Sequence, residues 1–494
     1  MQVRRYISAH LESVVKSLHW HFVFVKIIVF SLSRIIFCFG TETIQKNFIC
    51  LFEHFKTFRI AFCVLSIFSF NLALCNDKSQ EILPPEAQNL EISEISFVHE
   101  GRTQLFVLQR ELTIKVGQRF ELEEFNESMR KLRALPLFYE VIPLVFIKEN
   151  RSIKISIQVK ERWTTSPVFL IGGGGGVSYF TLGLQDINVL GRFLEVGARY
   201  VNFDGAHSGG VWFRNPRFLD RHLRVSSEIA RQERTRELYT PMAQRTGTYN
   251  LVRRKFSVGL DNEFFPFVTL GTGYEFDGDS FSQNHLTKIM HDENAKFSFD
   301  QPRNSRAHIL RLTASVGRIR NESYVFEGFL SESVFEATST SLGSADDFFK
   351  ITQTFLAHYI PAENQTLSLR LSLGLANTSA IQHQFFVGGL ESVRGFKDGQ
   401  FHGKRYWLGN FEYRVPSIVH RVFVMQHIFF ADAASAGDTW NETRPSRQTT
   451  GVSVGTGVRF VSPVIHRFTM RADYAWAVLP QNTSGLSFGI QQFF

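Results

Sequence analysis

The chain has 494 residues, too many for one small domain, and it carries a formal net charge of +8 with 20% charged residues. Its Lys and Arg residues are dispersed along the sequence rather than gathered in one basic stripe, which argues against nucleic acid as a partner. The 4 cysteines all precede Asn76, so the sequence after that residue can form neither a disulfide nor a thiolate metal site.

A secretory signal peptide is predicted over residues 56–75. This segment has a basic start at Lys56 and Arg59, an apolar core, and the small residue Ala73 at position −3 of a cleavage site after Cys75. Cys75 also gives the segment a likeness to a lipoprotein signal. Because Leu74 is a poor residue before a lipidated cysteine, we favour ordinary cleavage, with a mature chain that begins near Asn76.

Residues 1–55 contain a second apolar run, Phe22–Phe39. Lys26 and Arg34 interrupt it, so it would be a weak membrane-spanning helix. We interpret residues 1–55 as an extension upstream of the true start codon, and a membrane anchor is the alternative.

Residues 90–162 combine strand-like and helix-like patterns. The first strand changes parity near Ser93, which indicates either a bulge or a strand that starts there. Apolar residues then recur at helical spacing until Pro136 ends the pattern. The predicted elements are a strand at Leu90–Val98, helices within Gln104–Thr113 and Glu121–Ala134, and strands at Phe138–Ile147 and Ser152–Glu161. The order is that of a small α+β module.

A run of five glycines follows this module: Gly172, Gly173, Gly174, Gly175 and Gly176. No Gly-Lys-Ser/Thr follows it and no helix opens after it, so it is not a phosphate-binding loop. Glycines inside a strand weaken pairing and packing. A flexible linker end is the alternative interpretation.

From about residue 165 to residue 494, apolar and polar residues alternate with period two. In Thr366–Leu375 leucines face one way while Ser368, Arg370, Ser372 and Gly374 face the other. Arginine on the polar face of strand after strand, without helices to cover the apolar face, is typical of a transmembrane β-barrel. The 51 Phe residues suit lipid-facing positions. We predict about 16 antiparallel strands, with the least regular stretch, Asp279–Arg306, supplying one of them.

The sequence offers little support for catalysis. His285 and His291 lie in an irregular polar stretch, and no His/Cys/Asp group has metal-ligand spacing. No nucleophile elbow is present. We therefore expect no enzyme activity, no metal and no cofactor.

Several segments resemble one superfamily in the same order. The most specific is Val393-Arg394-Gly395-Phe396, on a loop about a hundred residues before the terminal Phe494. The others are Gly183–Arg192, Asn215–Leu219, Asn410–Pro416 and Phe429–Ala433. Together they resemble the BamA/TamA/FhaC superfamily of outer-membrane assembly and secretion proteins, and Arg130–Val141 resembles a polypeptide-transport-associated (POTRA) module. The resemblance covers residues 90–494.

The resemblance implies that Arg394 folds back into the barrel and meets acidic residues on neighbouring strands. Asp432 is the matching acid, and Glu412, on the polar face of its strand, is a second expected partner. Ala434 stands where the family pattern has glycine, which puts the local backbone geometry in question. A solvated loop charge is the alternative for Arg394.

The resemblance also implies a seam between the first and last barrel strands. The expected seam residues are Gly172–Gly176 on one side and Gly489 with Phe494 on the other. A disulfide between the strand near Val177 and the strand near Phe488 is expected to lock it.

The implied location is the bacterial outer membrane, with the α+β module in the periplasm. Our preferred function is an insertase or translocase that assembles or moves proteins, or lipid, through the seam. The alternative is a transporter that secretes one dedicated protein through the barrel lumen, and a plain porin is a weaker third. The expected partners are unfolded outer-membrane or secreted client proteins, outer-membrane lipid, and periplasmic chaperones or accessory subunits.

Overall fold

The computed structural model describes residues 87–149, 151–283, 285–322, 324–420, 422–462 and 468–490. The chain divides into two units, Met1–Lys78 and Ser79–Phe494, and all described residues belong to the second. The predicted extension 1–55, the predicted signal peptide 56–75 and Phe494 lie outside the described residues.

The first folded part is a small α+β module. Its elements are β1 (Glu91–Glu100), α3 (Leu105–Gln109), α4 (Leu122–Ala134), β2 (Phe138–Ile147) and β3 (Ser152–Glu161). The sheet order is β1-β3-β2, with β1 parallel to β3 and β2 antiparallel to it.

The apolar face of α4 explains why the module folds. Phe125, Met129 and Leu132 follow at helical spacing and are buried against Ile153 and Ile155 of the sheet. The parity change in the first strand is a bulge, because the register with β3 shifts between Ile92 and Glu94. No helix in the described residues is long and apolar enough to cross a membrane.

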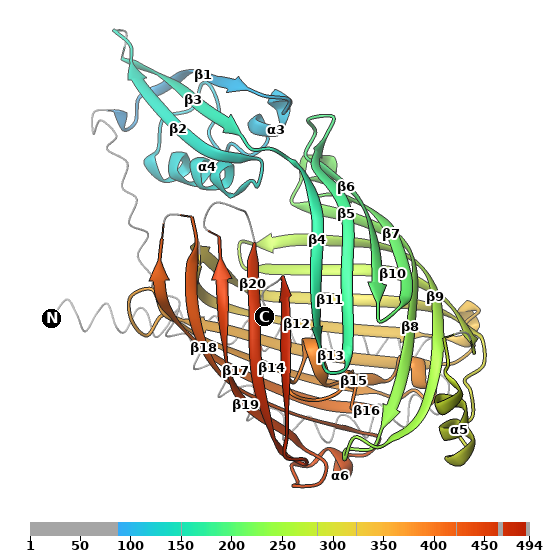
Figure 1. Ribbon diagram of the computed structural model, residues 1–494. Coiled ribbons are helices and arrows are strands. Elements are labelled where there is room, and N and C mark those ends of the chain that lie inside the picture. Colours follow the sequence, from blue (N-terminus) through green and yellow to red (C-terminus); the bar gives the residue numbers. More distant parts are fainter. Residues whose placement is uncertain are drawn as a thin grey trace, which may run out of the picture. The chain divides into compact units, whose positions relative to one another are not determined.

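In the described part of the chain, sixteen antiparallel strands form a closed barrel (Figure 1). They are β4 (Thr165–Gly174), β5 (Val177–Val189), β6 (Leu194–Phe203), β7 (Ala206–Asn215), β8 (Leu223–Tyr239), β9 (Arg245–Phe265), β10 (Val268–Ser282), β11 (Ser305–Glu322), β12 (Val325–Thr338), β13 (Phe348–Tyr359), β14 (Thr366–Ala376), β17 (Arg405–Val419), β18 (Val424–Gly437), β19 (Gly451–Val461), β20 (Thr469–Leu479) and β21 (Thr483–Ile490). The predicted fold class and strand number are therefore confirmed.

The shorter elements lie in the connections between barrel strands. They are 3-10 helices η2 (Phe218–Asp220), η3 (Thr340–Leu342), η4 (Ile381–His383) and η5 (Gly389–Glu391), helices α5 (Lys288–Lys296) and α6 (Trp440–Thr443), and strands β15 (Phe385–Val387) and β16 (Phe401–Gly403).

The expectation of a strand within Asp279–Arg306 is wrong. The described residues between Ser282 and Ser305 hold α5 instead. Thr287 caps this helix by accepting a hydrogen bond from the backbone of Met290. Asn294 fixes the helix to β9, because its side chain accepts a hydrogen bond from the Thr248 N–H and donates one to the Thr248 carbonyl. This stretch is polar and does not alternate with period two, so it lacks the apolar face that a membrane-spanning strand needs.

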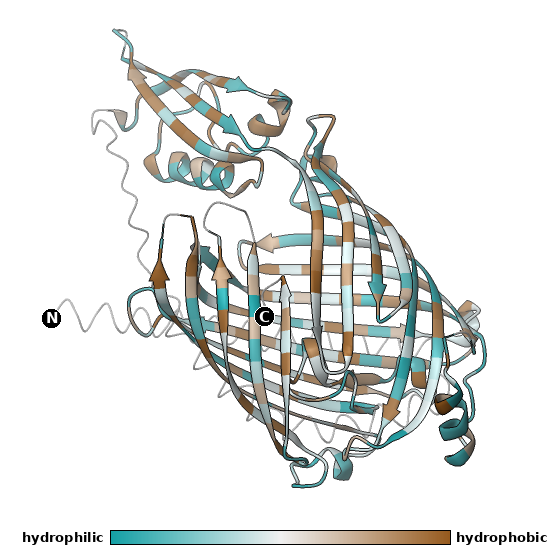
Figure 2. Ribbon diagram, in the orientation of Figure 1, coloured by the Kyte–Doolittle hydropathy of each residue, from teal (hydrophilic) through white to brown (hydrophobic). Residues whose placement is uncertain are grey.

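Hydrophobic and hydrophilic residues alternate along the barrel strands, as the sequence pattern predicts (Figure 2). On β20, Met470, Tyr474 and Trp476 are exposed, whereas Arg471 and Asp473 between them are buried. Apolar residues therefore face outward and charged residues face the interior.

Candidate functional site: a loop arginine and a strand seam

A long connection folds back inside the barrel. Residues 377–404 join β14 to β17 and contain η4, η5 and the paired short strands β15 and β16 (Figure 1). Val393 and Phe396 of this connection pack with Ala434 and Ala477, which belong to the inner faces of β18 and β20. We call residues 377–404 the luminal loop.

Arg394 lies at the centre of this packing, with a side chain that is 0% exposed. Its Nε and Nη2 donate to the two oxygens of Asp432 at 2.7 and 2.8 Å, and its Nη1 donates to Glu412 at 3.0 Å. The guanidinium also stacks on the ring of Phe430, with Cζ 3.4 Å from the ring centroid. The structure thus brings Arg394 together with both acids expected from the sequence.

Four further charged residues, which the sequence did not single out, complete this cluster. Asp473 lies 3.7 Å from Arg394 Nη1 and also pairs with Arg459. Arg414 donates to Glu412 at 2.8 Å. Arg471 lies 3.8 Å from Asp473 and donates to the Leu390 carbonyl of the luminal loop at 3.2 Å. All four occupy polar-face positions of their strands, so strand parity was the available signal.

The other residues of the loop motif fill space around Arg394. Val393 is 0% exposed, and Phe396 packs edge-on against Phe401. Gly395 has a φ of +87°, and a Cβ there would lie 3.2 Å from the Cβ of Ala475 on β20. Ala434 keeps the extended conformation of β18 and is buried beside Val393, so the departure from glycine leaves the strand intact.

The seam between β4 and β21 has a short register among the described residues. It consists of two pairs, Phe488↔Gly173 and Gly489↔Gly172. By contrast, the neighbouring β4–β5 hairpin is paired from Thr165 to Gly174. A Cβ on Gly173 would lie 3.1 Å from Phe488 Cε1, so the Phe488 ring covers the place that the missing side chain leaves open.

The remaining glycines of the run do not pair across this seam. Gly174 pairs with Val177 inside the hairpin, while Gly175 and Gly176, with φ of +64° and +86°, make its turn. Val177 therefore belongs to β5, and the expected disulfide between Val177 and Phe488 is replaced by one between Gly173 and Phe488. The run is neither a phosphate loop nor a linker end.

The luminal loop contacts both sides of the seam from within. On one side the backbone N–H of Asp398 donates to the Gly175 carbonyl at 2.9 Å, and a Cβ at Gly175 would lie 2.7 Å from the Phe396 carbonyl oxygen. On the other side Arg471 of β20 bonds to Leu390. A movement at the seam must therefore be accommodated by the loop that Arg394 anchors.

A polar junction joins the α+β module to the end of β5. Asn188 donates to Thr103 at 2.8 Å and to Glu161 at 3.1 Å, and Glu161 also accepts from the Thr103 backbone at 3.0 Å. Burial by itself raises the pKa of Glu161, but the hydrogen bonds from Thr103, His99 and Asn188 outweigh it, so the pKa lies below its usual value of 4.5. An ion pair between Arg102 and Asp186, at 2.6 Å, also joins the module to β5.

Metal binding finds no geometric support in the described residues, where no group of three or more His, Cys, Asp or Glu side chains could hold an ion. We call the buried charged residues around Arg394 the luminal cluster: Arg394, Glu412, Arg414, Asp432, Arg459, Arg471 and Asp473. Its acids form ion pairs with its arginines. These ion pairs hold the luminal loop in place.

A closed barrel with apolar residues outside and charged residues inside defines a transmembrane β-barrel of the outer-membrane type. The family model for the Omp85 superfamily domain matches residues 188–494, more than half of the chain, and the chain belongs to the Omp85 superfamily. The superfamily resemblance found in the sequence is thereby confirmed over residues 188–494.

Solved structures agree with this fold. BamA from Haemophilus ducreyi lacking POTRA domains 1–3 is 14% identical with a TM-score of 0.58, and the match covers 82% of this chain and 85% of that one. CdiB from Acinetobacter baumannii is 12% identical with a TM-score of 0.56, over 82% and 74% of the two chains. CdiB from Escherichia coli is 12% identical with a TM-score of 0.57, over 82% and 76%. At these identities the likeness is one of fold. A comparison with curated protein sequences finds no match.

Proposed function

We propose that this protein is an outer-membrane insertase or translocase that assembles or translocates client proteins through a lateral opening between β4 and β21. The observation that carries the proposal is the short register of that strand pair among the described residues. A closed barrel has no free edge, so a lateral exit has to form where strand pairing is easiest to break. Among the described residues the β4–β21 pair has two register positions, compared with ten in the β4–β5 hairpin, and at about 1 kcal/mol net per hydrogen bond this described pairing costs little to separate.

The luminal loop supports the same proposal. Because it bonds to Gly175 on one side of the seam and to Arg471 on the other, it can hold the closed state until a client arrives. The ion pairs of Arg394 with Asp432 and Glu412 hold the loop in this position. Secretion of a dedicated partner through the lumen would instead require the loop to leave its buried position.

The α+β module suits a periplasmic role in receiving clients. β1 and β2 are the outer strands of its sheet order, and Tyr139 and Phe146 on β2 are 60% and 50% exposed. An extended client segment could add to such an edge through backbone hydrogen bonds. Unfolded outer-membrane or secreted proteins are the partners we propose. The same module would recruit chaperones or accessory subunits that present an extended segment.

Depletion of the protein followed by quantitative proteomics of the outer membrane tests the proposal. We expect a broad loss of barrel proteins, which wild-type protein restores and the Arg394→Ala variant does not. Loss of one secreted protein alone, with the other barrels unchanged, would favour the dedicated transporter and contradict the insertase.

A further inference from the structure

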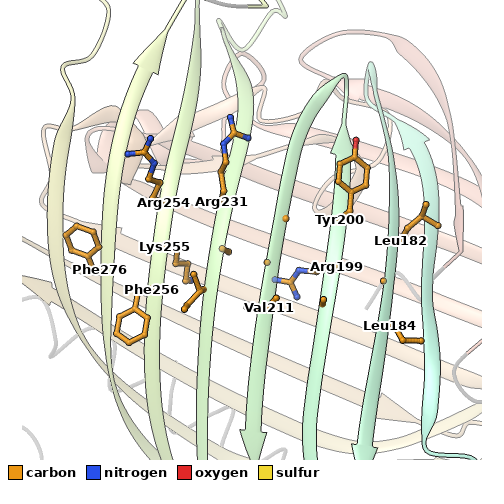
Figure 3. Close-up of a pocket in the computed structure, with 16 residues that line it drawn as sticks. Leu182, Leu184, Arg199, Tyr200, Val211, Arg231, Arg254, Lys255, Phe256 and Phe276 are labelled. Carbon is orange, nitrogen blue, oxygen red and sulfur yellow. The ribbon is translucent and has the colours of Figure 1, made fainter.

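The outer wall of the barrel carries a groove of about 980 Å³ across β5 to β10 (Figure 3). Two rows of outward-facing residues line it, as the strand registers show. One row is Leu182, Tyr200, Gly209, Arg231 and Arg254, and the next row is Leu184, Ala198, Val211, Ile229, Phe256 and Phe276. The groove therefore has a basic side and an apolar side.

Two arginines define the basic side. Arg231 and Arg254 are directly paired across β8 and β9, and both side chains are exposed on the wall that faces lipid. Figure 3 shows them beside each other, with Phe256 and Phe276 on the adjoining row. Two like charges in register repel each other, and among the described residues only Arg231 has a carboxylate partner, Glu233, so the charge of Arg254 is left for an anionic ligand to compensate.

The contacts of the two arginines leave donors available to a ligand. Arg231 donates to the Glu233 carboxylate at 2.8 Å and to the His207 carbonyl at 2.5 Å, which fixes its direction. Arg254 makes no ion pair with any residue that the structure describes. Gly209 and Gly278, their neighbours in the same row, keep the space beside the guanidinium groups open.

The height of the arginine pair on the wall is set by β9. Phe264, Phe265 and Phe267 are exposed at the β9–β10 turn, which lies at the module end of the barrel. Arg254 precedes Phe265 by 11 residues on β9. At about 3.3 Å per residue and a strand tilt of about 40°, this spans about 28 Å, close to the apolar band of about 25 Å in such barrels. The arginines therefore lie at the membrane interface remote from the module.

We propose that this groove binds a phosphorylated, multiply acylated lipid of the lipid A class, the anchor of lipopolysaccharide. Arg231 and Arg254 would hold a phosphate, and the row from Leu184 to Phe276 would pack against acyl chains. Placement in the outer leaflet rests on the periplasmic module proposed above. The site lies outside the luminal cluster and the seam, so a failure of lipid binding would leave the insertase proposal untouched.

Native mass spectrometry of the full chain in detergent tests the site, with bisphosphorylated lipid A as the probe. We expect Arg231→Gln/Arg254→Gln to weaken binding about tenfold through the loss of charge-assisted hydrogen bonds. Lipid A without phosphates should bind the wild type as weakly as the double variant does, and excess inorganic phosphate alone should not displace the lipid.

A second variant blocks the groove without changing its charge. A Cβ at Gly209 would have only the Arg199 carbonyl oxygen near it, at 3.4 Å, so Gly209→Phe fits the strand while its ring fills the groove. The matched control is Arg303→Gln/Arg306→Gln, which removes the same charge from exposed residues outside the groove. Equal binding by the wild type, Gly209→Phe and both double variants, or binding that does not depend on the lipid phosphates, would overturn the proposal.

Discussion

Replacement of Arg394 by alanine should release the luminal loop while the barrel stays folded. The guanidinium makes three hydrogen bonds to Asp432 and Glu412, and all three side chains are 0% exposed. Removal of one partner from a buried ion pair costs about 3–5 kcal/mol. Asp432 keeps hydrogen bonds from Asn410 and from the backbone N–H of residue 394, and Glu412 keeps Arg414, so we expect the lower value. A loss of about 3 kcal/mol raises the undocked population about a hundredfold.

Cysteine labelling measures this population directly. The chain has no cysteine after Cys75, so Val393→Cys provides a single reporter at a position that is 0% exposed when the loop is docked. Maleimide labelling of this reporter should be much faster with Arg394→Ala, whereas the heat-dependent gel mobility of the folded barrel should not change.

Lys397→Ala is the matched control. Lys397 lies three residues from Arg394 on the same loop, and its side chain is exposed. Its substitution removes the same charge without leaving a carboxylate buried and unpaired. If the reporter is labelled equally slowly in the wild-type protein, Arg394→Ala and Lys397→Ala, the ion pairs of Arg394 do not hold the luminal loop. The proposal that this loop keeps the seam closed is then refuted.

Three further outcomes follow from the geometry. Gly175→Ala should loosen the loop at its other attachment, since the residue has a φ of +64° and a Cβ would lie 2.7 Å from the Phe396 carbonyl oxygen; the same labelling assay measures it. Glu161 should stabilise the junction fully above its ordinary pKa of 4.5, and this effect should be lost as the pH falls through its lower folded pKa. In limited proteolysis Glu161→Gln should therefore be cleaved faster than wild type at neutral pH, and this difference should be much smaller in acid. Intact mass of outer-membrane material should give a mature chain that begins near Asn76 without lipid; retention of Phe22–Phe39 would contradict the signal peptide.

Strand parity made most of the barrel predictable from the sequence. Alternation identifies the inward face of each strand, which was sufficient to place Asp432 and Glu412 toward the interior. It does not give the curvature of the wall. Glu412 on β17 and Asp473 on β20 are separated by two strands in the barrel order, yet Arg394 and Arg459 each lie within 4 Å of both acids. That meeting could only be found in three dimensions.

The glycine run shows a different limit. Five consecutive glycines permit a turn at any position, because none of them carries a Cβ that disfavours positive φ. The sequence could therefore not decide where β4 ends, and Val177 was assigned to the wrong strand. α5 was missed because it is a short polar helix with no periodicity of its own, held by the hydrogen bonds between its Asn294 and Thr248 on the neighbouring strand β9.

A disulfide across the seam tests the central claim most directly. Gly173→Cys and Phe488→Cys form a register pair, and removal of the Phe488 ring leaves room for the bridge. The control bridge, Val454→Cys with Trp476→Cys, joins the register pair of two exposed residues on β19 and β20, away from the seam. We predict that the oxidised seam bridge abolishes assembly of barrel clients in cells, that reduction restores it, and that the control bridge has no effect. Full activity of the protein with its seam locked would contradict the lateral opening and would favour passage through the lumen.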